Sequence, residues 1–174
     1  MSTHSIYLSI GSNLGDRLGR LRSALGDLAA AGILPVTVSA VYETEPVGFP
    51  GQPWFLNLAA GANTDLAPEA ALDCCQNIER RHGRVRTYQG APRTLDIDIL
   101  LYDDLRLCSP RLLIPHPRMA ERRFVLVPMA EIAGGVVHPL LGKDIRTLLT
   151  RCGDASQVRR HLPEAPPDAF VHRD

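Results

Sequence analysis

The stretch Leu95-Asp96-Ile97-Asp98-Ile99-Leu100-Leu101-Tyr102 determines the predicted fold, because it is the last of four strands in a regular succession of strands and helices. Apolar and β-branched residues dominate it, as expected of a strand. Upstream, residues 68–83 have the apolar spacing of an amphipathic helix that opens with proline. The β-rich run at residues 55–63 precedes that helix and predicts the third strand.

Three more elements complete the pattern towards the N-terminus. Residues 36–44 are β-branched and predict the second strand, and residues 17–32 carry leucines at helical spacing up to a glycine. Residues 4–10 predict the first strand, which turn and cap residues at 11–16 join to the helix. This order is typical of an α+β, ferredoxin-like βαββαβ sandwich, with two helices on one side of a four-stranded antiparallel sheet and long substrate loops.

The composition is that of one globular domain, since 45% of the 174 residues are hydrophobic and 22% are charged. Shorter helical patterns at residues 118–132 and 144–151 follow the last strand. We assign residues 1–162 to a single domain and residues 163–174 to a proline-rich C-terminal tail.

Charge and composition exclude several classes of partner. Lysine plus arginine and aspartate plus glutamate each number 19, so no net field attracts a nucleic-acid backbone or an anionic membrane. No apolar run approaches the roughly 20 residues of a membrane span, and residues 1–5 lack the features of a signal peptide. The cytoplasm is therefore the expected compartment. The four cysteines have no zinc or redox spacing, which predicts reduced and mostly buried thiols.

Asp96 and Asp98 are the residues most suggestive of chemistry, because strand periodicity places them on one face while Ile97 and Ile99 point to the other. Two adjacent carboxylates raise each other's pKa unless a cation lies between them. Mg²⁺ suits such a pair, since it commonly binds one or two carboxylates together with substrate phosphates, whereas zinc prefers His or Cys. The alternative is an ordinary solvated strand face.

Cationic residues are concentrated on both sides of these aspartates. They are Arg80, Arg81, Arg84, Arg86 and Arg93 before the strand, and His116, Arg118, Arg122 and Arg123 after it. Guanidinium groups match phosphate oxygens in bidentate geometry, and cations around a paired-carboxylate metal site are typical of phosphoryl transfer. The three arginines nearest the strand are the stronger candidates, whereas Arg80, Arg81 and Arg123 are predicted to be solvated.

The loop at residues 43–57 contains three of the chain's nine aromatic residues, together with three prolines and two glycines. Aromatic faces beside hydrogen-bonding groups suit a flat polar heterocycle that is stacked on its face and recognised at its edge. Strand periodicity places Phe55 and Asn57 on the same side. The alternative is a hydrophobic plug under a long hairpin, which suits Trp54 best.

In combination, these motifs resemble the 6-hydroxymethyl-7,8-dihydropterin pyrophosphokinase family of folate biosynthesis. The resemblance covers about residues 6–145. The motifs that carry it lie at residues 11–16, 42–57, 83–86, 92–99 and 115–128. It implies an ATP-dependent diphosphotransferase that converts ATP and the pterin alcohol into AMP and the pterin diphosphate, with Mg²⁺ as cofactor. Its implied partners are these small molecules, with no nucleic acid and no membrane, and the expected assembly is a monomer.

The resemblance also implies roles for individual residues. Asp96 and Asp98 would hold two Mg²⁺ ions, and the implied catalytic residues are Arg84, Arg93, Asp96 and Asp98. The implied ATP contacts are Gln76, Glu79, Arg84, Arg86, Arg93, Ile99, Arg111, His116 and Arg122. The implied pterin contacts are Thr44, Glu45, Val47, Phe55, Asn57 and Phe124, with Phe55 and Phe124 on the two faces of the ring.

Two features depart from some relatives: Glu45 stands in place of a proline, and the loop at residues 87–91 is one residue shorter and lacks a tryptophan. Three other functions fit part of the pattern. RNA-recognition modules share the predicted fold, but this sequence lacks their aromatic motif. A regulatory ligand-binding domain would leave Asp96 and Asp98 without a cation. Transfer of adenylate or of one phosphoryl group fits the residue chemistry equally, and only the resemblance selects diphosphate transfer.

Overall fold

The computed structural model describes residues 2–85, 88 and 90–162. It contains the predicted strands and helices in the predicted order, with one strand divided in two. Their bounds are β1 His4–Ser12, α1 Arg17–Ala30, β2 Ile33–Val38, β3 Tyr42–Thr44, β4 Phe55–Thr64, α2 Pro68–Arg81 and β5 Asp96–Tyr102. Local chemistry sets the helix starts: Asp16 accepts a hydrogen bond from the Gly19 N–H, and Pro68 occupies the first turn of α2.

The central sheet has six strands in the order β5-β1-β4-β3-β8, with β2 also paired to β4. All of its pairings are antiparallel. In β1, Ile6, Leu8 and Ile10 are fully buried against α1 and α2, as a strand with one face on a helical layer requires. The predicted antiparallel sheet with helices packed on it is confirmed.

The prediction of one strand over residues 36–44 is wrong, because Ser39 interrupts it. The Ser39 N–H donates to the Ala59 carbonyl, and the Ser39 hydroxyl replaces a backbone carbonyl by accepting from the Ala59 N–H at 2.9 Å. Side-chain hydrogen bonds of this kind compete with the strand ladder. As a result, β2 pairs with the C-terminal half of β4, and β3 pairs with its N-terminal end, beside the loop at residues 45–54.

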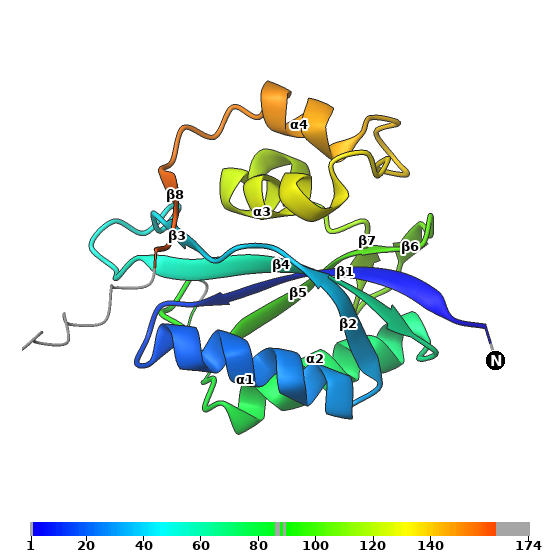
Figure 1. Ribbon diagram of the computed structural model, residues 1–174, viewed down its shortest axis with the longest axis horizontal. Helices are drawn as coiled ribbons and strands as arrows, with labels where there is room; N and C mark the ends of the chain where they lie inside the picture. The colour runs from blue at the N-terminus through cyan, green and yellow to red at the C-terminus, as the bar shows by residue number, and fades with distance from the viewer. Residues whose placement is uncertain (1, 86–87, 89, 163–174) are drawn as a thin grey trace, which may run out of the picture.

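Helices cover both faces of the sheet (Figure 1), whereas the predicted sandwich has helices on one face only. The helices α1 and α2 lie on one side, and α3 Arg123–Ala133 and α4 Ile145–Arg151 lie on the other. A short 3₁₀ turn, Met119–Glu121, precedes α3, so the helical pattern predicted at residues 118–132 is two elements. The second face buries its own cluster, which includes Leu101, Leu126 and Met129.

Three short strands were not predicted. The strands β6 Leu107–Cys108 and β7 Leu113–Ile114 form a hairpin, and β8 Val158–Arg160 pairs with β3 at the edge of the main sheet. Strands of two or three residues are too short to carry a period, so only tertiary contacts define them.

All four cysteines are free thiols, as predicted. The prediction that most of them are buried is wrong, since only Cys75 is buried and Cys108 is exposed. Burial raises the pKa of Cys75 to about 12.

Candidate active site

Asp96 and Asp98 emerge from β5 on the same face, as the strand period predicts, while Ile97 and Ile99 are buried beneath them. The Asp96 side chain is 15% exposed and the Asp98 side chain is 35% exposed. This strand therefore presents two accessible carboxylates to one side of the molecule and anchors them through its apolar side.

Asp96 is held by two arginines. Arg84 donates to one carboxylate oxygen at 2.5 Å, and Arg93 donates to the other. Arg84 also pairs with the buried Glu79, which accepts a hydrogen bond from the Ile97 N–H at 2.7 Å. Burial alone would lower the pKa of Arg84, but Asp96 and Glu79 hold it above its ordinary value. Arg84 is thus a fixed positive charge beside Asp96.

Among the described residues, no arginine pairs with Asp98 as Arg84 and Arg93 pair with Asp96, and the environment of Asp98 opposes ionisation. Burial, followed by repulsion from Asp96, raises the pKa of Asp98 to about 7, although Arg122 acts in the opposite direction. Mg²⁺ bound between the two carboxylates would favour the ionised form. Among the described residues there is no group of three or more His, Cys, Asp and Glu side chains able to hold a metal ion. The two neighbouring carboxylates of β5 are themselves a donor set that suits Mg²⁺, which completes its octahedral shell with water and substrate phosphates.

His116 faces Asp98, with its Nε2 atom 3.9 Å from a carboxylate oxygen. Burial, followed by the charge of Arg122, lowers the pKa of His116 to about 4, so the ring is neutral at physiological pH. Its Nδ1 atom accepts a hydrogen bond from the Arg118 N–H at 3.1 Å. The hydrogen of the neutral ring is therefore on Nε2, which makes His116 a donor towards the carboxylates.

A polar groove of about 470 Å³ lies beside these residues. Every predicted ATP contact within the described chain lines it, namely Gln76, Glu79, Arg84, Arg93, Ile99, Arg111, His116 and Arg122. Arg86, the remaining predicted contact, lies outside the described residues. The groove-lining residues that were not predicted as contacts are Leu72, Ile97, Ser109, Pro110, Leu112, Leu113 and Pro117. Most of these belong to the β6–β7 hairpin and its flanks, which had no sequence signal.

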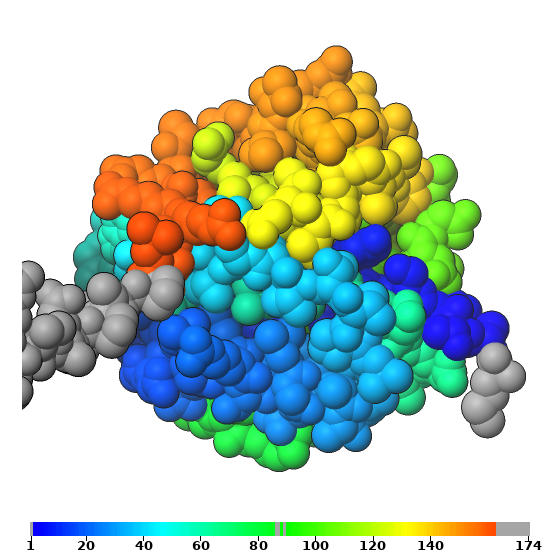
Figure 2. Space-filling model, in the orientation of Figure 1, coloured from blue at the N-terminus to red at the C-terminus, as the bar shows by residue number. Residues whose placement is uncertain are grey.

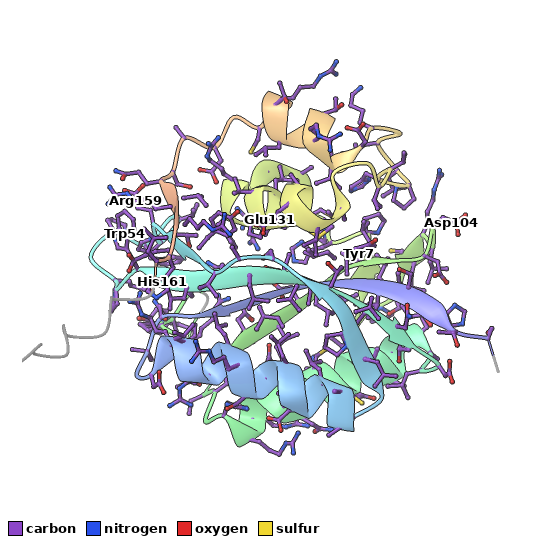
Figure 3. All side chains as sticks on the ribbon, viewed as in Figure 1. Tyr7, Trp54, Asp104, Glu131, Arg159 and His161 are labelled. Carbon is purple, nitrogen blue, oxygen red and sulfur yellow. The ribbon has the colours of Figure 1, made fainter. Side chains whose placement is uncertain are left out.

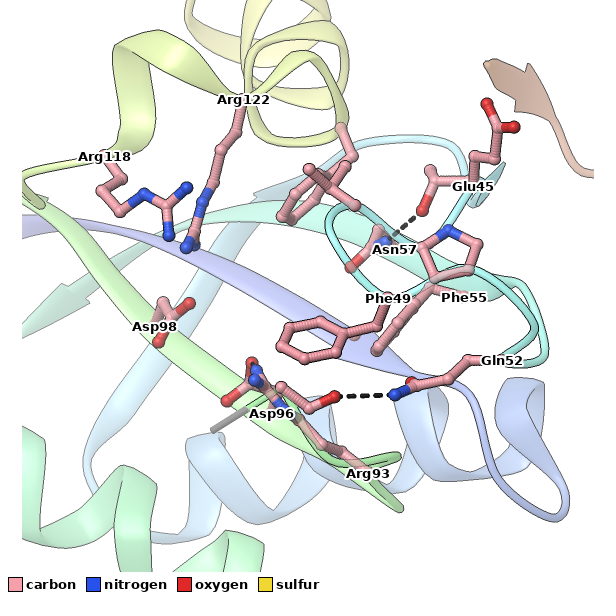
Figure 4. A pocket seen from close by; sticks show the side chains of 16 residues that line it. Glu45, Phe49, Gln52, Phe55, Asn57, Arg93, Asp96, Asp98, Arg118 and Arg122 are labelled. Atoms are coloured by element: carbon pink, nitrogen blue, oxygen red, sulfur yellow. Dashed lines mark hydrogen bonds and ion pairs between the residues drawn. The ribbon is translucent and has the colours of Figure 1, made fainter. Parts of the chain in front are cut away.

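An aromatic cavity of about 150 Å³ adjoins the groove (Figure 4). Every predicted pterin contact lines it, namely Thr44, Glu45, Val47, Phe55, Asn57 and Phe124. The residues that the sequence analysis did not place here are Gly11, Pro46, Phe49, Gln52, Gly90 and Arg118. Trp54 is not among the lining residues.

Asn57 is held in a single orientation at the floor of the aromatic cavity. Its Nδ2 atom donates to the Thr44 hydroxyl at 2.7 Å, and both side chains are buried. Gly11 lies opposite on β1, where a Cβ atom would stand 2.3 Å from the Asn57 Oδ1 atom. The absence of a side chain at residue 11 therefore leaves the space that this amide occupies.

Two loops meet across the mouth of the aromatic cavity. Gln52, in the β3–β4 loop, donates to the Gly90 carbonyl at 2.8 Å, and the Phe49 ring lies where a Cβ atom at Gly90 would stand. Gly90 has a φ of 80°, a conformation that favours glycine. Asn13 supports both loops, since it donates to Gln52 at 3.2 Å and accepts from the Arg93 N–H at 2.7 Å.

The groove and the cavity share Arg93, Asp96, Asp98 and Arg122 as lining residues. Figure 4 shows Arg118 and Arg122 pointing towards Asp98 from one side, with Arg93 beside Asp96 on the other. The two carboxylates therefore lie at the junction of a polar and an aromatic chamber, among fixed positive charges. Arg81 is exposed, as predicted, and Arg80 is an exposed residue whose hydrogen bond joins it to Asn77 of its own helix.

Two chambers that meet at paired carboxylates are the arrangement expected of a transferase that holds two substrates side by side. The sequence model described as 7,8-dihydro-6-hydroxymethylpterin-pyrophosphokinase (HPPK) matches residues 7–134. The chain belongs to this family, and the family predicted from the sequence motifs is confirmed, together with its enzyme class.

Its relatives include two bacterial proteins named 2-amino-4-hydroxy-6-hydroxymethyldihydropteridine pyrophosphokinase. The protein from Methylorubrum extorquens is 43% identical over 155 residues, covering 88% of this chain and 96% of that protein. The protein from Bacillus subtilis is 41% identical over 169 residues, covering 97% of this chain and 96% of that protein. Both alignments span nearly the full length of the relative.

A solved structure of Plasmodium falciparum HPPK-DHPS with pteroate has the same fold. It superposes with a TM-score of 0.69 at 16% identity and covers 86% of this chain. This chain spans 42% of that fused protein. At this identity the similarity concerns the fold alone.

Proposed function

We propose that this protein transfers diphosphate from ATP to the hydroxymethyl group of 6-hydroxymethyl-7,8-dihydropterin, giving AMP and the pterin diphosphate in folate synthesis. The observation that carries the proposal is the meeting of a polar and an aromatic chamber at Asp96 and Asp98. Residue chemistry leaves adenylate and single phosphoryl transfer open, and family membership selects diphosphate transfer.

In this proposal the polar groove binds ATP. Gln76, Glu79, Ile99 and Arg111 surround the nucleoside, while Arg84, Arg86, Arg93, His116 and Arg122 contact the phosphates. Support comes from the lining of the groove and from the neutral His116 ring, whose Nε2–H is a suitable donor to a phosphate oxygen. Arg111 is exposed and pairs with Asp73.

Asp96 and Asp98 are proposed to hold two Mg²⁺ ions together with the ATP phosphates. The bound metal would supply charge neutralisation at the bridging and departing oxygens. The hydroxymethyl oxygen attacks the β-phosphorus in line and loses its proton to solvent, the bond between the α–β bridging oxygen and that phosphorus breaks, and AMP leaves with the electron pair of that bond. Arg84 and Arg93, already fixed beside Asp96, stabilise the charge that develops on the transferred group.

The aromatic cavity is proposed to bind the pterin. Phe55 and Phe124 provide faces for stacking, and Thr44, Glu45 and Val47 complete the wall. Asn57 is proposed to recognise the edge of the ring, supported by its hydrogen-bonded amide and by the space that Gly11 leaves for that amide. The contact of Gln52 with Gly90 brings the two loops together over this cavity and so favours exclusion of water from the reaction.

We extend the proposal to the architecture and the state of the protein. The strand order β5-β1-β4 with β2 and β3 beyond supports a ferredoxin-like core, to which α3, α4 and β8 are additions. We propose a single domain over residues 1–162 with a tail at 163–174, a monomer, and a cytoplasmic location. None of the described helices has the length and apolar character to cross a membrane. Light scattering on the purified protein tests the monomer, and limited proteolysis tests the domain boundary.

Nucleotide product analysis tests the reaction. The purified protein is incubated with ATP and Mg²⁺, with and without 6-hydroxymethyl-7,8-dihydropterin, beside the Asp98→Ala variant. The expected result is AMP that forms only with the pterin and only with the intact protein. ADP would indicate transfer of one phosphoryl group, and free diphosphate with an adenylated pterin would indicate adenylate transfer. Binding of both ligands without turnover would favour a regulatory domain.

A further inference from the structure

The C-terminal segment, residues 154–161, contacts two walls of the aromatic cavity that come from distant parts of the chain. In Figure 1 its strand β8 lies beside β3 at the edge of the sheet, below the chain that leaves α4. Figure 2 shows the same segment, in orange-red, packed on the cyan residues that form this edge. The sequence analysis gave this segment no role.

The first wall is the start of α3. The Asp154 carboxylate accepts a hydrogen bond from the Arg123 N–H at 2.8 Å and another from the Ser156 N–H at 2.9 Å. Arg122, the residue that precedes α3, contributes no capping side chain of its own. Asp154 therefore caps this helix from 31 residues away. Arg122 and Phe124, on either side of the capped residue, both line the cavity.

The second wall is β3 and the residue that follows it. In β8, Val158 pairs with Thr44 in antiparallel register. One residue further, the Glu45 N–H donates to the Gln157 carbonyl at 3.1 Å, and the Gln157 N–H donates to the Glu45 carboxylate at 2.9 Å. Thr44 and Glu45 line the cavity. Both the backbone and the side chain of Glu45 are thus engaged, and a proline here would lack the N–H.

A cation–π contact fastens the same edge. The Arg159 guanidinium carbon lies 5.1 Å from the centre of the Trp54 ring, and Figure 3 shows the two side chains together. Trp54 immediately precedes β4, whose first residue, Phe55, lines the cavity. The segment consequently reaches both ends of the β3–β4 loop as well as α3.

No residue of the C-terminal segment lines the groove or the cavity, within the part of the chain that the structure describes. We infer that this segment is a positioning element, which fixes the Phe124 wall relative to the Thr44–Glu45 wall and thereby sets the affinity for the flat heterocycle. The inference rests on the proposed function, because the heterocycle is the pterin assigned to that cavity. The groove is bounded mainly by α2, β5 and the β6–β7 hairpin, and Arg122 also lines it beside the capped residue, so ATP binding is expected to depend on the segment less than pterin binding does.

The chain offers a matched control for Asp154. Asp144 caps α4 in the same way, by accepting from the Thr147 N–H at 2.7 Å, yet no residue of α4 lines the cavity. The variants Asp154→Ala and Asp144→Ala each remove one helix cap of the same chemistry. Only the first removes a cap beside Phe124. Asp154→Asn retains an oxygen acceptor and is the conservative variant.

Equilibrium binding of 6-hydroxymethyl-7,8-dihydropterin and of ATP to the full-length variants tests the inference. Asp154→Ala is expected to raise the pterin Kd about fivefold, which corresponds to the free energy of one lost helix cap, and to raise the ATP Kd by a smaller factor through Arg122. Asp144→Ala should leave both Kd values unchanged, and Asp154→Asn should recover most of the pterin affinity. A chain ending at residue 162 should match the full-length protein.

The outcomes distinguish failure of the positioning role from failure of the proposed function. If Asp154→Ala binds pterin as tightly as the intact protein, or if Asp144→Ala weakens it equally, the positioning role is wrong while the proposed function stands. If the intact protein itself does not bind the pterin, the proposed function is wrong. Thermal melting of each variant identifies any loss of folded protein, and Asp154→Asn keeps the test valid if the alanine variant does not fold.

Discussion

Arg84 and Asp96 form an ion pair with atoms 2.5 Å apart, which joins the loop after α2 to the first residue of β5. Both side chains are about 85% shielded from solvent, with exposed fractions of 14% and 15%. The pair therefore serves the fold and the site together, because the same guanidinium that joins Glu79 of α2 to Asp96 of β5 also lines the groove.

Replacing Arg84 with alanine should affect both stability and rate. Removal leaves Asp96 and Glu79 without a shared cation, so the free energy of unfolding should fall by about 3 kcal/mol. With a donor to the transferred group lost, kcat should fall roughly 100-fold. Urea unfolding and steady-state kinetics measure the two effects. Arg81→Ala, on the exposed face of α2, should change stability by no more than about 0.5 kcal/mol and leave kcat intact. Equal effects of the two variants on stability and kcat would contradict the role assigned to Arg84.

Gly11→Ala should act on the pterin and not on ATP. The new methyl group would overlap the Asn57 amide and displace it from the Thr44 hydroxyl. We expect the pterin KM to rise roughly tenfold, as for loss of one well-formed hydrogen bond, with an unchanged ATP KM. Gly26→Ala is the control, since nothing lies within 4 Å of a Cβ atom there. It should stabilise α1 by about 1 kcal/mol and leave both KM values unchanged. A rise in the ATP KM for Gly11→Ala would show that residue 11 acts through the fold.

The pKa of Asp98 predicts how stability responds to pH and Mg²⁺. The folded protein binds this proton more tightly than the unfolded chain does, where the pKa is about 3.9. The group's stabilising contribution is therefore complete below about pH 4 and is lost as the pH rises through about 7. Mg²⁺ binds the ionised carboxylate, so the metal should raise the melting temperature well above pH 7 and hardly at all near pH 5. Asp98→Asn should remove this dependence on pH and metal, and an unchanged Mg²⁺ response in that variant would exclude Asp98 as a ligand.

The Tyr42 hydroxyl, which lies outside the active site, has a raised pKa of its own. Its hydroxyl donates to the Glu131 carboxylate at 2.5 Å, and burial, followed by this hydrogen bond and the carboxylate charge, raises the pKa of Tyr42 to about 12. The stabilisation that accompanies the shift is complete below pH ~10 and is lost as the pH rises through about 12. Ultraviolet titration should show a tyrosine ionising near pH 12 that Tyr42→Phe removes, whereas Tyr102, whose pKa burial also raises, remains in that variant. That variant should also lose about 1 kcal/mol of stability at neutral pH. A normal titration of all tyrosines would contradict the contact.

The parts of the site that follow from local periodicity were predictable. Asp96 and Asp98 share a face because a strand alternates every residue, and the same rule places Phe55 and Asn57 together. The resemblance supplied the distant partners, and every predicted contact within the described chain lines the expected chamber.

Other parts depend on contacts that no local pattern encodes. Phe49 and Gln52 line the cavity because their loop folds back onto Gly90, a contact across 38 residues. The strand division at Ser39 depends on its hydroxyl meeting Ala59. The helical patterns of α3 and α4 were visible, but the face of the sheet that they cover is decided by long connections.

The shared floor of the two chambers has a consequence for how ligands sense each other. Arg93, Asp96, Asp98 and Arg122 border both spaces, so an anion or cation arriving in the groove alters the electrostatic potential felt in the cavity. Such a linkage is reciprocal by thermodynamic necessity: whatever factor ATP and Mg²⁺ impose on pterin affinity, the pterin must impose on theirs. The junction therefore has a single coupling free energy, which can be measured from either side.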